Sequence, residues 1–136
     1  MMMTQSQIFG HVGAPLSNVR WSWGAQRQCD GAVFLLVWQD ESRRIEGNHY
    51  TLVDNASYFQ GESAKLGRAE RLGHIELIRA GAQSYMVMCL VVDRNAVPRS
   101  VASINDQEVF VGGKLIDVNG DTWLERIERR PLAAVR

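Results

Sequence analysis

The chain has 136 residues, and its 15 lysines and arginines balance 15 aspartates and glutamates, so its formal net charge at pH 7 is zero. This length suits a single domain, which can fold without disulfides or a metal. Hydrophobic residues make up 46% and charged residues 22% of the chain, which excludes an intrinsically disordered protein. The missing basic excess argues against a protein that binds nucleic acid or anionic membranes non-specifically.

Residues 1–16 contain glycines and a proline among mixed residue types, and we expect them to form a loosely ordered N-terminal arm. They lack the basic residues and the apolar segment of a signal peptide. No apolar run approaches the roughly 20 residues of a spanning helix. We therefore expect a cytoplasmic protein without a membrane partner, with one domain over residues 17–130 and a C-terminal tail over 131–136.

The first predicted element is a β-hairpin. Residues 20–25 alternate in polarity, with Trp21 and Trp23 on one face, which is typical of a half-buried strand. Residues 28–31 end in Asp-Gly, a common hairpin turn. Residues 33–38 are apolar on both faces, which predicts a strand buried on both sides.

The one long helix is expected over residues 63–80, with Ser63 as its N-cap and Gly81 in the left-handed conformation after its end. Its apolar residues recur every third position, so the apolar stripe drifts around the helix. Three arginines lie beside that stripe: Arg68, Arg71 and Arg79. Either their stems cover apolar surface while the charged groups reach water, or the arginines point into a site.

Further short strands are expected over residues 49–53, 85–92, 101–104, 108–111, 115–118 and 122–128, with turns at Gly112-Gly113 and Asn119-Gly120. About seven strands and one main helix predict an α+β fold. We expect a strongly curved, mostly antiparallel sheet or a partly open β-barrel, with the helix covering it.

The sequence contains partial matches to two ligand-binding motifs, a calcium loop and a phosphate loop, and neither match is complete. Residues 117–128 approach a calcium loop, but Thr122 stands where the loop needs glycine, so a hairpin is favoured. The Gly112-Gly113-Lys114 segment lacks the rest of a phosphate loop. Cys29 and Cys89 show no paired spacing and are expected to be reduced thiols. We predict no catalytic residues, no metal and no cofactor.

Clustered aromatic residues carry the main functional hypothesis. Trp21 and Trp23 lie beside Arg20, and Trp38 ends the partner strand of the same hairpin. Indoles stack well on planar ligands, and arginines bind phosphate oxygens. The alternatives are that these indoles fill the core or form a subunit interface. The candidate ligand-binding residues are Arg20, Trp21, Trp23, Trp38, Tyr58, Arg68 and Arg71.

Three segments carry a resemblance: Asn18-Val19-Arg20-Trp21-Ser22-Trp23-Gly24-Ala25, residues 33–40 and residues 68–74. Together they resemble uncharacterised small bacterial proteins of mobile gene cassettes, similar segments of which occur beside restriction-type nuclease modules. The expected architecture is also similar to base-reading PUA-like barrels, by analogy only. Neither resemblance implies a catalytic residue.

Three functions follow as hypotheses. The first is a non-enzymatic binding domain that receives a nucleobase, a nucleotide or a flipped base in the aromatic pocket. The second is a homo-oligomeric, for example homodimeric, accessory module of mobile DNA, whose exposed tryptophans and Met86/Met88 strand meet a second subunit. The third is a small enzyme that uses a carboxylate with His49 or His74.

Overall fold

The computed structural model describes residues 3–55, 61–96 and 99–135, with residues 61–63 described by their backbone alone. No helix in these ranges has the length and apolar character needed to cross a membrane. The elements are α1 (Gln5–His11), β1 (Gly24–Gln26), β2 (Val33–Trp38), β3 (Ser42–Ile45), β4 (Asn48–Asp54), α2 (Gly61–Arg79), β5 (Ser84–Val91), β6 (Val101–Ile104), β7 (Glu108–Val118), β8 (Asp121–Pro131) and the 3-10 helix η1 (Leu132–Val135).

The strands form one mostly antiparallel sheet in the order β1-β2-β5-β7-β8-β4-β3, with β6 paired to β5. Among the described strands, the parallel pair joins β2 to β5, with Phe34 opposite Tyr85. The sheet curls without closing, because no ladder joins β2 to β4 among the described strands. The predicted α+β class with an open, curved sheet and a covering helix is confirmed.

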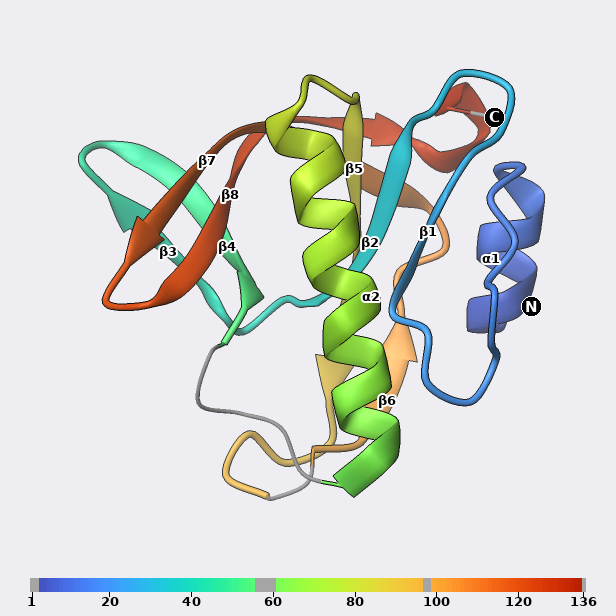
Figure 1. Ribbon diagram of the computed structural model, residues 1–136, viewed down its shortest axis with the longest axis horizontal. Coiled ribbons are helices and arrows are strands. Elements are labelled where there is room, and N and C mark those ends of the chain that lie inside the picture. The colour runs from blue at the N-terminus through green and yellow to red at the C-terminus, as the bar shows by residue number, and fades with distance from the viewer. Residues whose placement is uncertain (1–2, 56–60, 97–98, 136) are drawn as a thin grey trace.

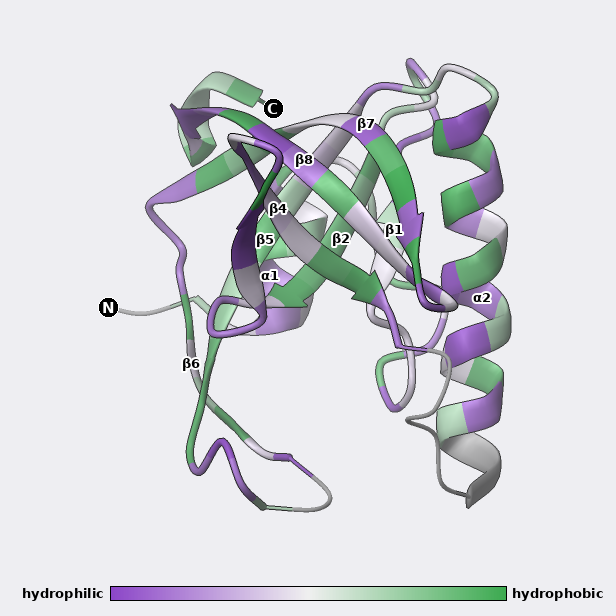
Figure 2. Ribbon diagram, turned by 90° about the vertical axis from the view of Figure 1, so that its left-hand side faces the viewer, coloured by the Kyte–Doolittle hydropathy of each residue, from purple (hydrophilic) through white to green (hydrophobic). Residues whose placement is uncertain are grey.

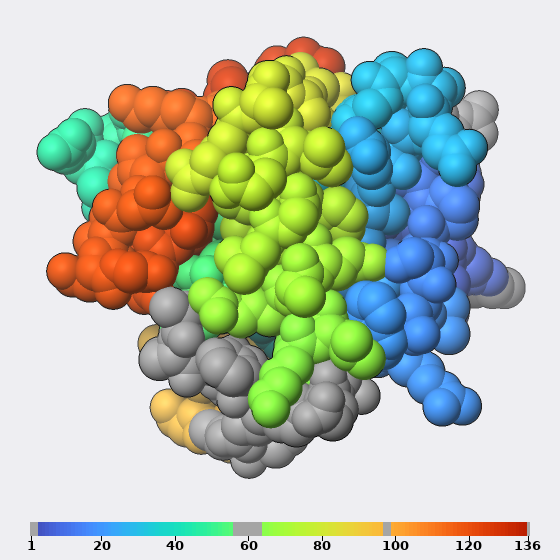
Figure 3. Space-filling view, viewed as in Figure 1, coloured from blue at the N-terminus to red at the C-terminus, as the bar shows by residue number. Residues whose placement is uncertain are grey.

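The two sides of the sheet bury separate apolar clusters, and α2 lies across the middle of one face (Figures 1 and 3). Ile75 and Ile78 of α2 pack with Leu35 and Met86. On the other side, the cluster includes Phe34 and residues of α1 and η1. Strand β2 and the first six residues of β5 are therefore buried on both faces, as predicted, whereas Leu90 near the end of β5 is exposed.

Both ends of the chain are more ordered than expected. The N-terminal arm forms α1, whose capping box pairs Thr4 with Gln7. Ile8 and Phe9 are completely buried, because α1 supplies its side of the sheet with apolar cover. The expected C-terminal tail continues β8 to Pro131 and then forms η1.

The strand predicted over residues 20–25 begins only at Gly24. Polar side chains bond the preceding backbone into a turn: Asn18 Oδ1 accepts from the Arg20 N–H, and Ser22 Oγ accepts from the Asn18 N–H. Such local bonds compete with strand pairing. Gly24–Gln26 then pairs with Val33–Leu35, so the predicted hairpin is present in shortened form.

The Gly112-Gly113 turn is wrong, since β7 runs unbroken from Glu108 to Val118. A Cβ on Gly112 would lie 2.1 Å from Ser84 Oγ, so glycine here permits close approach of β5 and β7 at a register shift. The turn at Asn119-Gly120 is confirmed, with φ of 53° and 86°.

Helix α2 begins at Gly61, two residues before the expected cap, and ends as predicted before Gly81, whose φ is 110°. The drifting apolar stripe is visible in Figure 2 as alternating hydrophobic and hydrophilic bands. Leu66 and Leu72 are exposed, whereas Ile75 and Ile78 are buried. Only the C-terminal half of the stripe therefore anchors the helix on the apolar core.

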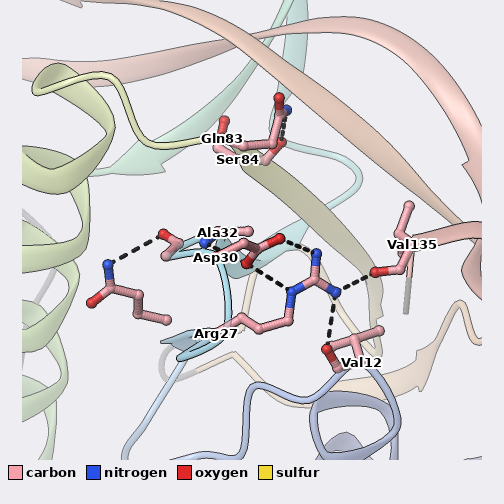
Figure 4. Close-up of polar contacts among 9 residues, drawn as sticks. Val12, Arg27, Asp30, Ala32, Gln83, Ser84 and Val135 are labelled. Atoms are coloured by element: carbon pink, nitrogen blue, oxygen red, sulfur yellow. Dashed lines mark hydrogen bonds and ion pairs between the residues drawn. The ribbon is translucent and has the colours of Figure 1, made fainter.

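Arg27 joins the two ends of the chain to the hairpin loop (Figure 4). Its Nη1 donates to the carbonyl of Val12, at 3.1 Å, and to that of Val135. Its Nε and Nη2 donate to Asp30 at 3.0 and 2.8 Å, which lowers the pKa of that carboxyl to about 2. The guanidinium also lies 5.1 Å from the Phe34 ring centroid. One buried cation thus fixes three segments that are distant in sequence.

We expect Arg27→Ala to lower the free energy of unfolding by about 3 kcal/mol, because two buried carbonyls lose their donor. Denaturant unfolding measures this loss. Arg130→Ala is the control, because Arg130 is exposed and its ion pair is with exposed Glu128. Equal effects of the two substitutions would contradict the role given to Arg27.

Candidate functional site

A hollow of about 420 Å³ lies at the open seam between β2 and β4, beneath the N-terminal half of α2. We call it the aromatic pocket. Strand β2 contributes Leu36, Val37 and Trp38; β4 contributes Leu52, Val53 and Asp54; α2 contributes Ala64, Gly67, Arg68 and Arg71; and connecting segments contribute Arg20, Trp21, Trp23, Glu41, Asn55 and Arg99.

Arg71 bridges the seam where main-chain pairing is missing. Its Nη1 donates to the carbonyl of Val53 on β4 at 2.7 Å. Its Nη2 donates to the carbonyls of Leu36 on β2, at 2.7 Å, and of Trp23, at 2.8 Å. A planar guanidinium with five N–H donors suits this arrangement of three acceptors. The side chain of one helical residue therefore holds together the two strands on either side of the pocket.

Arg71 also brings a poorly compensated positive charge into the pocket. Burial lowers its pKa to about 10, so the guanidinium stays protonated at neutral pH. Within the described ranges, no carboxylate forms an ion pair with it, and its buried Nε has no hydrogen-bond partner. A buried cation without a counter-ion favours an anionic or electron-rich neighbour.

The indoles form the apolar wall. Trp23 and Trp38 lie with ring centroids 5.4 Å apart, tilted by 47°. The Arg99 guanidinium stacks 4.7 Å from the Trp38 centroid. Trp21, Trp23 and Trp38 are all half-buried, so part of the surface of each residue remains accessible to solvent. The wall therefore combines fixed aromatic faces with adjacent cations.

Two carboxylates of the lining are held by arginines. Asp54, with a side chain 6% exposed, accepts from Nε and Nη2 of Arg68 at 3.0 Å each. Glu41 accepts from Arg99 at 3.0 Å, and burial raises the pKa of Glu41. Because four arginines and two carboxylates line the pocket, the described lining has two positive charges in excess.

The structure brings six of the seven candidate residues to this one pocket: Arg20, Trp21, Trp23, Trp38, Arg68 and Arg71. The seventh, Tyr58, lies outside the described residues. Of the two interpretations of the helix arginines, Arg68 and Arg71 follow the second and point into the pocket. Arg79 follows the first, since it is exposed and pairs with Glu76 and Asp117.

The structure differs from the predicted site in two respects. Arg68 and Arg71 were expected to supply phosphate contacts, but their end groups already bind Asp54 and main-chain carbonyls. Arg99, which reaches the site from the segment after β5, was not among the residues predicted from the sequence. No local pattern around Arg99 marks it, because its partners Asp40 and Glu41 are nearly 60 residues away.

Groups that other hypotheses use lie elsewhere. Met86 and Met88 are at most 1% exposed and pack within the chain, so these two side chains do not offer a surface to a second subunit. His49 is exposed, with Nε2 3.5 Å from Arg44, and burial lowers the pKa of His74. Cys29 and Cys89 are free thiols, and burial raises the pKa of Cys89 to about 12.

Comparison with protein-family models, curated proteins and solved structures finds no match for this chain. The resemblance to proteins of mobile gene cassettes, and the analogy with PUA-like barrels, stay predictions.

Gly67 sets how closely α2 approaches the tryptophan segment. A Cβ there would lie 2.8 Å from the carbonyl oxygen of Trp21, whereas a Cβ on Gly73 of the same helix meets nothing within 4 Å. We expect Gly67→Ala to destabilise by about 1–3 kcal/mol through overpacking. Gly73→Ala is expected to stabilise by about 0.5–1 kcal/mol through helix propensity.

Thermal unfolding with tryptophan emission compares these two alanine variants. The emission of Gly67→Ala should shift, because Trp21 and Trp23 must move away from the helix. Stabilisation by both substitutions would show that close contact between α2 and this segment does not shape the pocket.

The hydrogen bonds of Arg71 across the seam predict a large effect of its substitution on stability. Arg71→Ala removes the guanidinium donors from the carbonyls of Val53, Leu36 and Trp23, of which Trp23 still accepts from the Leu36 N–H. We expect it to lower the free energy of unfolding by about 3 kcal/mol or more. Arg79→Ala, in the same helix, removes only surface ion pairs and should cost under about 1 kcal/mol. Denaturant titration measures both, and a small loss for Arg71→Ala would contradict its bridging role.

Proposed function

We propose that this protein is a binding domain for a planar ligand of the nucleobase type, either free, as part of a nucleotide or as a base flipped out of a strand. The observation that carries the proposal is the aromatic pocket, in which three half-buried indoles meet the buried cation Arg71 at an open seam.

Size and stacking support this choice. Small-molecule pockets usually measure about 300–1,000 Å³, and the aromatic pocket, at about 420 Å³, falls in that range. Indoles stack on every base because each base has a π-face. The hydrogen-bonding groups around the indoles come from Arg20, Asn55 and the carboxylates of Glu41 and Asp54.

Charge supports it as well. The described lining has more positive than negative charges. Arg71 is desolvated, and electrostatic attraction between its guanidinium and a negatively charged or electron-rich ligand is stronger there than in water. The carbonyl and ring-nitrogen acceptors of a base, or the phosphate of a nucleotide, suit such a pocket. Its two carboxylates are already bound by Arg68 and Arg99, so neither is a free general base in this state.

The test titrates adenosine, guanosine, cytidine and uridine, with their 5′-monophosphates, against tryptophan fluorescence and by calorimetry. We expect quenching that saturates for at least one of them. Trp21→Ala should weaken that binding by about tenfold or more, because base–aromatic stacking contributes about 1–3 kcal/mol. Trp21 is the best choice for truncation, because it is half-buried and lies in a turn.

Trp123→Phe is the matched control for nucleoside binding. Trp123 lies on β8, outside the aromatic pocket, and is only 8% exposed. The proposal fails if no nucleoside or nucleotide quenches the fluorescence at millimolar concentration. It fails equally if folded Trp21→Ala and Trp23→Ala variants bind as tightly as the unaltered protein.

A further inference from the structure

A second hollow, of about 490 Å³, adjoins the aromatic pocket and shares its residues Glu41 and Arg99. We call it the basic hollow. Its remaining wall comes from the start of β3, the turn after β5 and Trp123 of β8. The ion pair between Arg99 and Glu41 therefore stands between the two hollows, with stacking surface on one side and further arginines on the other.

Two guanidinium groups of the basic hollow keep their charge available. Arg43 and Arg94 line it, and in the described part of the chain neither has a carboxylate within ion-pair distance. Asp40 and Glu41 also line it, but both are bound by Arg99. An incoming anion thus meets free cations at Arg43 and Arg94, and carboxylates that already have a counter-ion.

Arg43 is held in place before any anion arrives. Its guanidinium lies over the Trp123 ring, 4.3 Å from the centroid, which restricts the side chain without using its N–H donors. Fixing a side chain in advance lowers the entropic cost of binding. A guanidinium so placed can donate two parallel hydrogen bonds to phosphate oxygens.

We infer that the basic hollow is the phosphate subsite of the ligand whose base stacks in the aromatic pocket, so that the ligand is a phosphorylated nucleoside. This inference rests on the proposed function. The base lies against the indoles, the sugar crosses beside the Glu41–Arg99 pair, and the phosphate lies between Arg43 and Arg94. A free nucleotide and a nucleotide within a single strand share this chemistry.

The experiment compares each of the four nucleosides with its 5′-monophosphate and 3′-monophosphate, and with the dinucleotide of the same base, at low ionic strength. We expect at least one phosphorylated form to bind about tenfold more tightly than its nucleoside, because charge-assisted hydrogen bonds to phosphate are strong. Added salt should reduce this difference. Gain by the dinucleotide indicates a strand, and gain by the monophosphates alone indicates a free nucleotide.

Arg94→Ala should remove most of the phosphate gain while leaving nucleoside binding unchanged, since Arg94 is exposed in a turn. Arg43→Gln should act in the same direction. The matched control is Arg44→Ala, which removes the same charge from the neighbouring residue of β3, outside both hollows. That control should keep the full gain.

Each result decides a different question. Equal binding of nucleosides and their phosphorylated forms overturns the phosphate subsite but leaves the proposed function standing. A phosphate gain that persists in the Arg43→Gln/Arg94→Ala double variant also overturns it. If neither nucleosides nor nucleotides bind, the proposed function itself fails.

Discussion

The arrangement depends on one guanidinium that replaces a missing strand pairing. A sheet that curls this far brings β2 and β4 near each other, yet no main-chain ladder joins them in the described structure. Arg71 donates to carbonyls on both sides and to Trp23, so a helical side chain satisfies acceptors that a neighbouring strand would normally satisfy. The gap left by the ladder is the space in which the aromatic pocket lies. Stability and pocket shape therefore share one cause.

The same bridge explains the electrostatic character of the pocket. Carbonyl oxygens carry partial negative charge, which is enough to hold Arg71 in place but leaves its full charge without a counter-ion among the described residues. Arg68 and Arg99, by contrast, bring their own carboxylates. The pocket thus combines neutralised pairs, which fix the wall, with two cations, Arg20 and Arg71, that form no ion pair within the described residues. Stacking surface from the indoles lies beside these cations.

The sequence indicated the indole grouping and the fold class, because hairpin register and apolar patterning are local signals. Trp21, Trp23 and Trp38 meet in the structure even though residues 20–23 form no strand, since β1 and β2 still pair. The bridging role of Arg71 could not be predicted from the sequence. The carbonyls of Leu36 and Trp23 lie 35 and 48 residues away in the chain, and every residue type carries a carbonyl, so no sequence pattern marks them as partners. The turn predicted at Gly112-Gly113 was wrong for a related reason. Glycine is needed at Gly112 because Ser84 of another strand lies close to it, and a tertiary contact of this kind leaves no local sequence signal.

The missing ladder between β2 and β4 affects how easily these two strands separate. Separating two paired strands breaks a series of main-chain hydrogen bonds, whereas among the described residues these two strands are joined by the hydrogen bonds of Arg71 and by side-chain packing. That opening therefore breaks fewer main-chain hydrogen bonds than separation of the long β7–β8 ladder does. Widening this gap changes the pocket while it leaves the remaining ladders intact.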